Sequence, residues 1–159
     1  MKNVVRIGID YHGVITANPD FFRAFCALAI ADGAEIYILS GGFTKDIKAF
    51  LDAHNIAYSH IWSMADYFDN KRQLTRLNDG TFQVDDKSWN KAKAEYCLEN
   101  KIDFHIDDSA VYGKYFATPF CLYNPQSHTC SNNEMIIDFR QSPVLALNSI
   151  LNFVQQQKA

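Results

Sequence analysis

Carboxylate and hydroxyl side chains end three apolar runs of this chain, and lysines precede the last of these runs. Asp10 ends VVRIGID, Ser40 ends AEIYILS, and Asp107 and Asp108 close IDFHIDD. A carboxylate can attack a phosphoryl group when a divalent cation and an amine offset the negative charges of both partners. These residue types therefore predict phosphoryl-transfer chemistry, provided that the fold brings them together.

The elements that must position these side chains alternate along the chain. Asn18 is expected to cap the first helix, with Pro19 in its first turn and Gly33 at its end. Asp79-Gly80 predicts a hairpin over 76–85, within a small insert at 66–88. Strands are predicted at 4–10, 34–40, 57–62, 102–107 and 119–124, and helices at 18–33, 41–55, 64–77, 89–101, 109–116 and 143–156.

Strands alternating with helices predict the α/β class with a doubly wound parallel sheet. Residues 1–159 are expected to form one domain, because 159 residues with 48% hydrophobic residues fit one core and leave room only for a small insert. In such sheets, ligands bind beyond the carboxyl ends of the strands. Asp10, Ser40, Asp107 and Asp108 are therefore expected to converge on one edge.

Two further groups could bind phosphate at this edge. Ser40 and the backbone amides that follow it, Gly41 first, are expected to bind phosphate oxygens at a helix start. A lysine ammonium would offset the charge of the substrate and of Asp10. Three lysines near the start of the helix before the acidic pair could supply it: Lys87, Lys91 and Lys93.

These motifs, in this order, resemble those of the haloacid dehalogenase (HAD) superfamily of hydrolases. That family has DxDG(T/V), a strand-ending Ser or Thr, a Lys and an acidic pair, and this chain reads DYHGVIT, ILSGG, KAEYC and IDDS. The resemblance implies a HAD-like Rossmannoid fold and a Mg²⁺-dependent phosphatase that acts through an aspartyl-phosphate. It also implies minimal or no cap, since only the segment around LNDGTF could cover the site.

The resemblance implies roles for individual residues. Asp10 would be the nucleophile, and Ser40 and a lysine would bind the phosphoryl group. Lys93 is the preferred lysine, because it resembles the family's lysine at the start of the helix that leads into the acidic pair; Lys87 and Lys91 are the alternatives. Asp10, the main-chain oxygen of His12 and Asp108 would hold Mg²⁺, with Asp107 adjacent and bound directly or through water.

His12 stands where the family has a second Asp, which protonates the leaving oxygen and then helps water hydrolyse the aspartyl-phosphate. Imidazole can donate and accept a proton near neutral pH, so His12 is the candidate for both transfers. The alternative is that His12 only fills space beside Tyr11. Family members that cleave C–halogen or C–P bonds also differ here, although the retained acidic pair argues against dehalogenation, which needs no Mg²⁺.

A different class of hypothesis is a catalytically degenerate protein that binds a phosphorylated ligand or a protein partner. The missing acid favours it, whereas the retained Asp10, Ser40, lysine and acidic pair oppose it. A response-regulator receiver is excluded by order, because its acidic pair follows the first strand.

Composition limits the partners. A net charge of -3 with scattered Lys and Arg excludes a broad nucleic-acid surface. No leader-like or membrane-spanning run is visible, so a cytoplasmic protein without membrane partners is expected. The four cysteines lack metal or disulfide spacing and are expected to be reduced and mostly buried.

The predicted open site would admit a small-molecule or macromolecular phosphate ester, or gain its lid from a second subunit of a homo-oligomer. Four aromatic residues could stack on a base or sugar, but core packing is the preferred interpretation for all of them: Tyr11, Phe43, Trp62 and Trp89.

Overall fold

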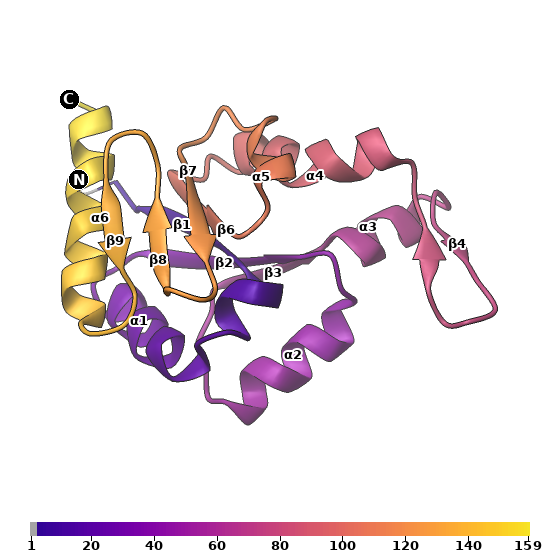
Figure 1. Ribbon diagram of the computed structural model, residues 1–159, viewed down its shortest axis with the longest axis horizontal. Helices are drawn as coiled ribbons and strands as arrows, with labels where there is room; N and C mark the ends of the chain where they lie inside the picture. The colour runs from indigo at the N-terminus through magenta and orange to yellow at the C-terminus, as the bar shows by residue number, and fades with distance from the viewer. Residues whose placement is uncertain (1–2) are drawn as a thin grey trace.

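The computed structural model describes residues 3–159 and contains a seven-stranded sheet (Figure 1). The central strand β1 (Arg6–Asp10) lies between β2 (Glu35–Ser40) and β6 (Phe104–Asp107). The order is β3-β2-β1-β6-β7-β8-β9, parallel from β3 to β7 and antiparallel beyond. The predicted α/β class is confirmed, but the sheet is parallel over five strands only, because β8 and β9 continue it in antiparallel pairing. The outer strands are β3 (His60–Ser63), β7 (Phe120–Asn124), β8 (Thr129–Ser131) and β9 (Ile136–Asp138).

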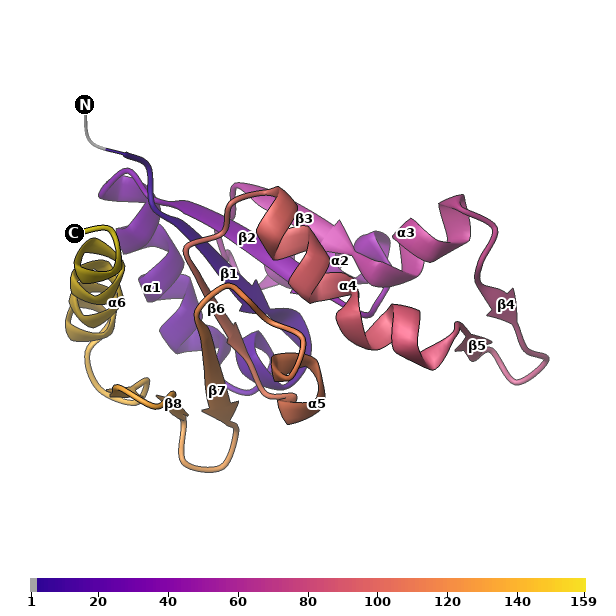
Figure 2. The same ribbon diagram turned by 90° about the horizontal axis from the view of Figure 1, so that it is seen from above.

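Helices cover both faces of this sheet, and the strands alternate their side chains between them. Ile36 and Ile38 of β2 join the core beneath α1 (Pro19–Ala31), α2 (Thr44–Ala53) and α6 (Pro143–Gln157). Their neighbours Tyr37 and Leu39 face α4 (Asp86–Glu99), where they pack with Cys97. Figure 2 shows α1 and α6 on one side of the sheet and α4 on the other. The larger core therefore lies on the α1–α6 side, and α4 covers the face that carries the site.

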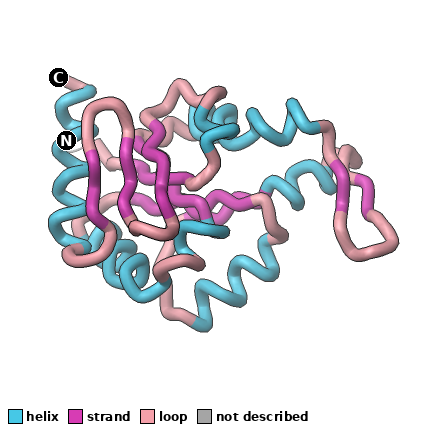
Figure 3. The backbone as a smooth tube through the Cα atoms, in the orientation of Figure 1, coloured by secondary structure: helices cyan, strands magenta, loops and turns pink. Residues whose placement is uncertain are grey.

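Short elements complete the chain. The π-helical turn η1 (Tyr11–Ile15) follows β1, and α5 (Ala110–Gly113) follows β6. The helix α3 (Met64–Asn70) leads to a hairpin of β4 (Thr75–Arg76) and β5 (Phe82–Gln83), which extends away from the sheet (Figure 3). The hairpin that Asp79-Gly80 predicts is therefore present, and Gly80 adopts a positive φ of 86°.

Several predicted boundaries are wrong. The helix predicted over 64–77 ends at Asn70, because Arg72 turns the chain with a φ of 59°. Asn18 stands at the N-cap position of α1, as predicted, but its side chain accepts no helix amide and instead donates to the carbonyl of Phe139 at 2.8 Å. The helix predicted from 89 begins at Asp86, because the Asp85 carboxylate accepts the amide of Ser88 and caps it. Lys93 therefore lies in the middle of α4, not at its start.

The strands β8 and β9 were not predicted. Each has only three residues, too few to show an alternating pattern, and each is stabilised by its pairing with a neighbour. The four cysteines are free and buried, as predicted: Cys26, Cys97, Cys121 and Cys130. No helix within residues 3–159 has the length and apolar character needed to cross a membrane.

Candidate active site

The predicted strand-ending side chains lie at the carboxyl ends of adjacent parallel strands. Asp10 is the last residue of β1, Ser40 of β2 and Asp107 of β6. Asp10 pairs with Leu39 in the β1–β2 register, and Ile9 pairs with Ile106 in the β1–β6 register, so the three strands end level with one another. The order of connections reverses at β1, with β2 on one side and β6 on the other. Sheets of this class bind ligands at such a position.

Lys93 connects two of these carboxylates. Its Nζ lies 2.7 Å from Asp10 Oδ1 and 2.8 Å from Asp107 Oδ2, and its side chain is only 2% exposed. The two alternative lysines do not reach the site: Lys87 is exposed, and Lys91 forms an ion pair with Glu95 at 3.4 Å. Lys93 is therefore the lysine that the fold places between the acidic residues.

Burial and charge shift the pKa values of this network in different directions. Burial raises the pKa of Asp10 well above its ordinary value, although the Lys93 ammonium opposes this shift. Burial alone would also raise the pKa of Asp107, but Lys93 and His105 outweigh it and hold that pKa below its ordinary value. Burial acts to lower the pKa of Lys93, and the two carboxylates raise it instead. Lys93 therefore stays a cation, and Asp10 is the carboxylate whose charge is least compensated.

Three carboxylates come close enough to share a cation. Asp10, Asp107 and Asp108 each offer an oxygen within 4.8 Å of the others. Asp107 already accepts bonds from Lys93, His105 and the amide of Ser109, whereas Asp108 is exposed. Gly13 makes room for Asp108, since a Cβ there would lie 2.1 Å from Asp108 Oδ2. This set of hard oxygen donors fits Mg²⁺, with Asp10 and Asp108 as the better placed ligands.

His12 lies in the turn that follows Asp10. It interrupts η1 with an extended backbone (φ -78°, ψ 122°), and Gly13 then takes a φ of 85°. The imidazole of His12 is exposed, which does not fit the interpretation that it only fills a pocket. Tyr11, beside which His12 was expected to fill space, packs edge-on against Phe50 with the ring centroids 5.4 Å apart.

The loop after Ser40 is more internally bonded than predicted. The amide of Gly42 donates to Ser40 Oγ at 3.1 Å, and the amide of Thr44, where α2 begins, donates to Asp66 Oδ2 at 2.9 Å. Those two amides are thus directed at protein oxygens. Gly41 lies under the ring of Trp89, since a Cβ there would come within 2.9 Å of that ring. Ser40 and Gly41 lie at the predicted edge, but two backbone amides near the start of α2 already donate to protein oxygens instead of facing a phosphate site.

His105 and Tyr112 were not singled out from the sequence as parts of the site, and Trp89 was considered only for stacking on a base or sugar or for core packing. His105 Nε2 bonds Asp107 Oδ2 at 2.9 Å, and the Tyr112 ring lies 5.0 Å from Lys93 Nζ. Trp89 donates from Nε1 to the hydroxyl of Tyr112 at 2.9 Å. His105 could have been found as a polar residue in an otherwise apolar strand, two positions before Asp107 and so on its face. The contact between Trp89 and Tyr112 depends on tertiary packing alone.

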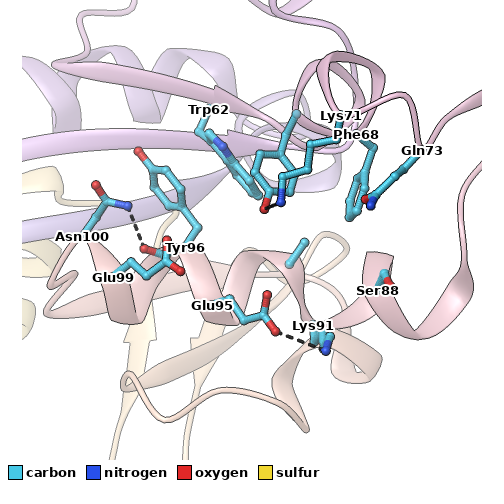
Figure 4. A pocket seen from close by; sticks show the side chains of 12 residues that line it. Trp62, Phe68, Lys71, Gln73, Ser88, Lys91, Glu95, Tyr96, Glu99 and Asn100 are labelled. Atoms are coloured by element: carbon cyan, nitrogen blue, oxygen red, sulfur yellow. Dashed lines mark hydrogen bonds and ion pairs between the residues drawn. The ribbon is translucent and has the colours of Figure 1, made fainter.

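A cleft of about 380 Å³ lies between α3 and α4 (Figure 4). Trp62 stacks on Tyr96 at one end, with the ring centroids 4.4 Å apart, and Ala92 contributes a small side chain. Its lining belongs to a different face of α4 from that of Lys93. Trp62 and Trp89 both pack in the small core that contains Met64 and Phe68, as the core-packing interpretation predicts.

Comparison with known proteins adds no assignment. No protein-family model matches the chain, and a search of curated proteins finds no significant match.

Proposed function

We propose that this protein is a Mg²⁺-dependent phosphatase of the HAD type, which hydrolyses a phosphomonoester through an aspartyl-phosphate on Asp10. The observation that carries this proposal is the bridging position of Lys93, 2.7 Å from Asp10 and 2.8 Å from Asp107 at the ends of adjacent strands. A fully buried lysine between two carboxylates has a high desolvation cost. Such groups are concentrated at functional sites, where they position reacting charges.

Each charged residue has a role in the proposed reaction. Among residues 3–159, Lys93 is the side-chain donor to Asp10 and bonds Oδ1, which leaves Oδ2 for attack on phosphorus. The new bond joins Oδ2 to phosphorus as the ester P–O bond breaks. Lys93 offsets the charge that accumulates between Asp10 and the phosphoryl group, and Ser40 Oγ contacts a phosphoryl oxygen. Mg²⁺ held by Asp10, Asp108 and the His12 carbonyl would neutralise further negative charge on the phosphoryl oxygens.

His12 supplies the two proton transfers in this proposal. As an imidazolium it gives a proton to the leaving oxygen, which departs as an alcohol. As the neutral base it then takes a proton from the water that attacks the aspartyl-phosphate, and this releases phosphate and restores Asp10. The exposed position of His12, two residues after Asp10, supports this role. An unchanged turnover in His12→Ala would sink the role of His12 but not that of Asp10.

The test uses an activated aryl phosphate and a panel of alkyl phosphomonoesters, with and without Mg²⁺. Wild type is compared with Asp10→Asn and with Asp52→Asn, a matched change of an exposed acid on α2. Mg²⁺-dependent turnover that Asp10→Asn abolishes and Asp52→Asn preserves supports the proposal. Turnover of the aryl ester alone means that no group protonates the leaving oxygen. Absence of turnover with both ester types contradicts a phosphatase.

The presence of His12 where the family has an acid favours one alternative function. A catalytically degenerate protein that binds a phosphorylated ligand would tolerate His12 in place of the acid. It would show a Mg²⁺-dependent rise in melting temperature with a phosphate ester but no release of phosphate. A thermal-shift titration beside the turnover assay separates the two functions.

A further inference from the structure

We propose that His105 is a positioning residue, which fixes the carboxylate of Asp107 and through it the ammonium of Lys93 against Asp10. This inference rests on the proposed function for its kinetic consequence. Its structural part, the placement of Lys93, can be measured whether or not the protein is a phosphatase.

His105 lies in a buried slot between aromatic side chains and the backbone of β1. It is fully buried on β6, stacked on Phe116 with the ring centroids 5.0 Å apart and the planes 6° apart, and it packs against Phe120. Gly8, its partner on β1, leaves room for the ring: a Cβ there would lie 2.6 Å from His105 Nδ1. These contacts on both sides of the ring hold its orientation and direct Nε2 at Asp107.

His105 has a buried nitrogen without a hydrogen-bond partner, and a residue that only fills the core would not need to bear this cost. Nδ1 is the one buried side-chain nitrogen or oxygen within residues 3–159 that has no hydrogen-bond partner. An apolar side chain in this slot would avoid that penalty. Because the Asp107 carboxylate can only accept, Nε2 is the donor, and Nδ1 is left bare in the neutral ring. The bond to Asp107 is thus the interaction that a histidine gains here over a phenylalanine.

That bond completes the set of donors around Asp107. Oδ2 accepts from His105 at 2.9 Å and from Lys93 at 2.8 Å, while Oδ1 accepts from the amide of Ser109 at 3.1 Å. Three donors from different directions leave the carboxylate one orientation. Lys93 is shared between this fixed carboxylate and Asp10, so His105, Asp107, Lys93 and Asp10 form a continuous buried chain. Outer partners of this kind commonly change activity 10- to 100-fold when removed, an order-of-magnitude range.

The test compares His105→Phe, which keeps the ring but loses the donor, with His105→Gln, which keeps a donor. His54→Phe is the matched control, since His54 also stacks on an aromatic ring, Phe50, but lies outside the site. The first readout is the NMR signal of the Lys93 ammonium in protein labelled with ¹⁵N-lysine, without Mg²⁺ or substrate, assigned with Lys93→Arg. The second is the separation of kcat from KM in the phosphatase assay.

We expect His105→Phe to shift the Lys93 signal and speed its exchange with water, and to lower kcat roughly 10- to 100-fold with KM within about twofold. His105→Gln should recover part of both changes, and His54→Phe should alter neither. A His105→Phe protein with a wild-type Lys93 signal, or a His105→Gln protein no better than His105→Phe, overturns the proposal. If His105→Phe does not fold, His105→Leu replaces it. If wild type has no phosphatase activity, the proposed function fails and the NMR comparison alone decides the role of His105.

Discussion

Two lysines on the same helix, two residues apart, have different environments. Lys93 faces the sheet with a side chain 2% exposed and contacts two carboxylates that are each less than a tenth exposed. Lys91 faces the cleft between α3 and α4, 40% exposed, and pairs with Glu95, which is 55% exposed. Both lysines form ion pairs, but water competes with the second pair and hardly reaches the first. The comparison shows that burial, not the type of charge, separates the candidate site from the neighbouring surface.

The largest difference is expected from removing each lysine in turn. Lys93→Met leaves two buried carboxylates without their cation and should lower the free energy of unfolding by about 3–5 kcal/mol. Lys91→Met should change it by less than about 0.5 kcal/mol. Urea unfolding of both variants at neutral pH measures the difference. Equal effects of the two substitutions would show that the Lys93 network is not buried in solution.

Removing Asp107 should have the next largest effect. Asp107→Asn weakens the bonds from Lys93 and His105, and should cost about 2–3 kcal/mol at pH 7. The folded-state pKa of Asp107 is lowered, so its contribution to stability is present above the unfolded pKa of about 3.9 and is lost as pH falls through the folded value. The penalty of the substitution should therefore shrink below about pH 4. Urea unfolding of wild type and Asp107→Asn between pH 7 and pH 3 measures this penalty. A penalty that grows as pH falls would contradict the lowered pKa of Asp107.

Asp10 should behave in the opposite way, although it contacts the same lysine. Burial raises the pKa of Asp10, so the free energy of unfolding falls as pH rises from about 4 towards the folded-state pKa. Asp10→Asn should thus increase the free energy of unfolding at pH 7, without Mg²⁺. It should also remove any rise in melting temperature on adding Mg²⁺. A variant that is less stable than wild type at pH 7 would contradict the raised pKa.

The smallest effect is expected at the exposed pair. A double-mutant cycle on Lys91 and Glu95 should give a coupling of about 0.3–0.5 kcal/mol at low salt. The coupling should vanish near 1 M salt, because the Debye length falls to about 3 Å there. A Lys93–Asp107 cycle under the same conditions should keep most of its coupling. Equal salt sensitivity of the two cycles would remove the distinction between the two faces of α4.

Much of the fold could be predicted from local pattern. The apolar runs that end at Asp10, Ser40 and Asp107 are strands, and their order with the intervening helices yields the parallel sheet. The end of α3 and the pair β8–β9 could not be predicted, because a left-handed residue and three-residue strands leave little periodic signal. A predicted boundary is wrong where a single hydrogen bond sets the end of the element, as the Asp85 cap does for the start of α4.

The sequence by itself determined which chemical groups stand at the ends of the strands, because strand direction and the alternation of faces follow from residue order. The resemblance favours Lys93, but the tertiary structure decided that this lysine joins them, since Lys87, Lys91 and Lys93 are alike in type and lie at different positions around α4. It also decided that His105 bonds Asp107 and that Asp66 takes an amide at the start of α2. These contacts depend on how α4, the loops and the sheet pack together, and packing between segments distant in sequence leaves no local pattern.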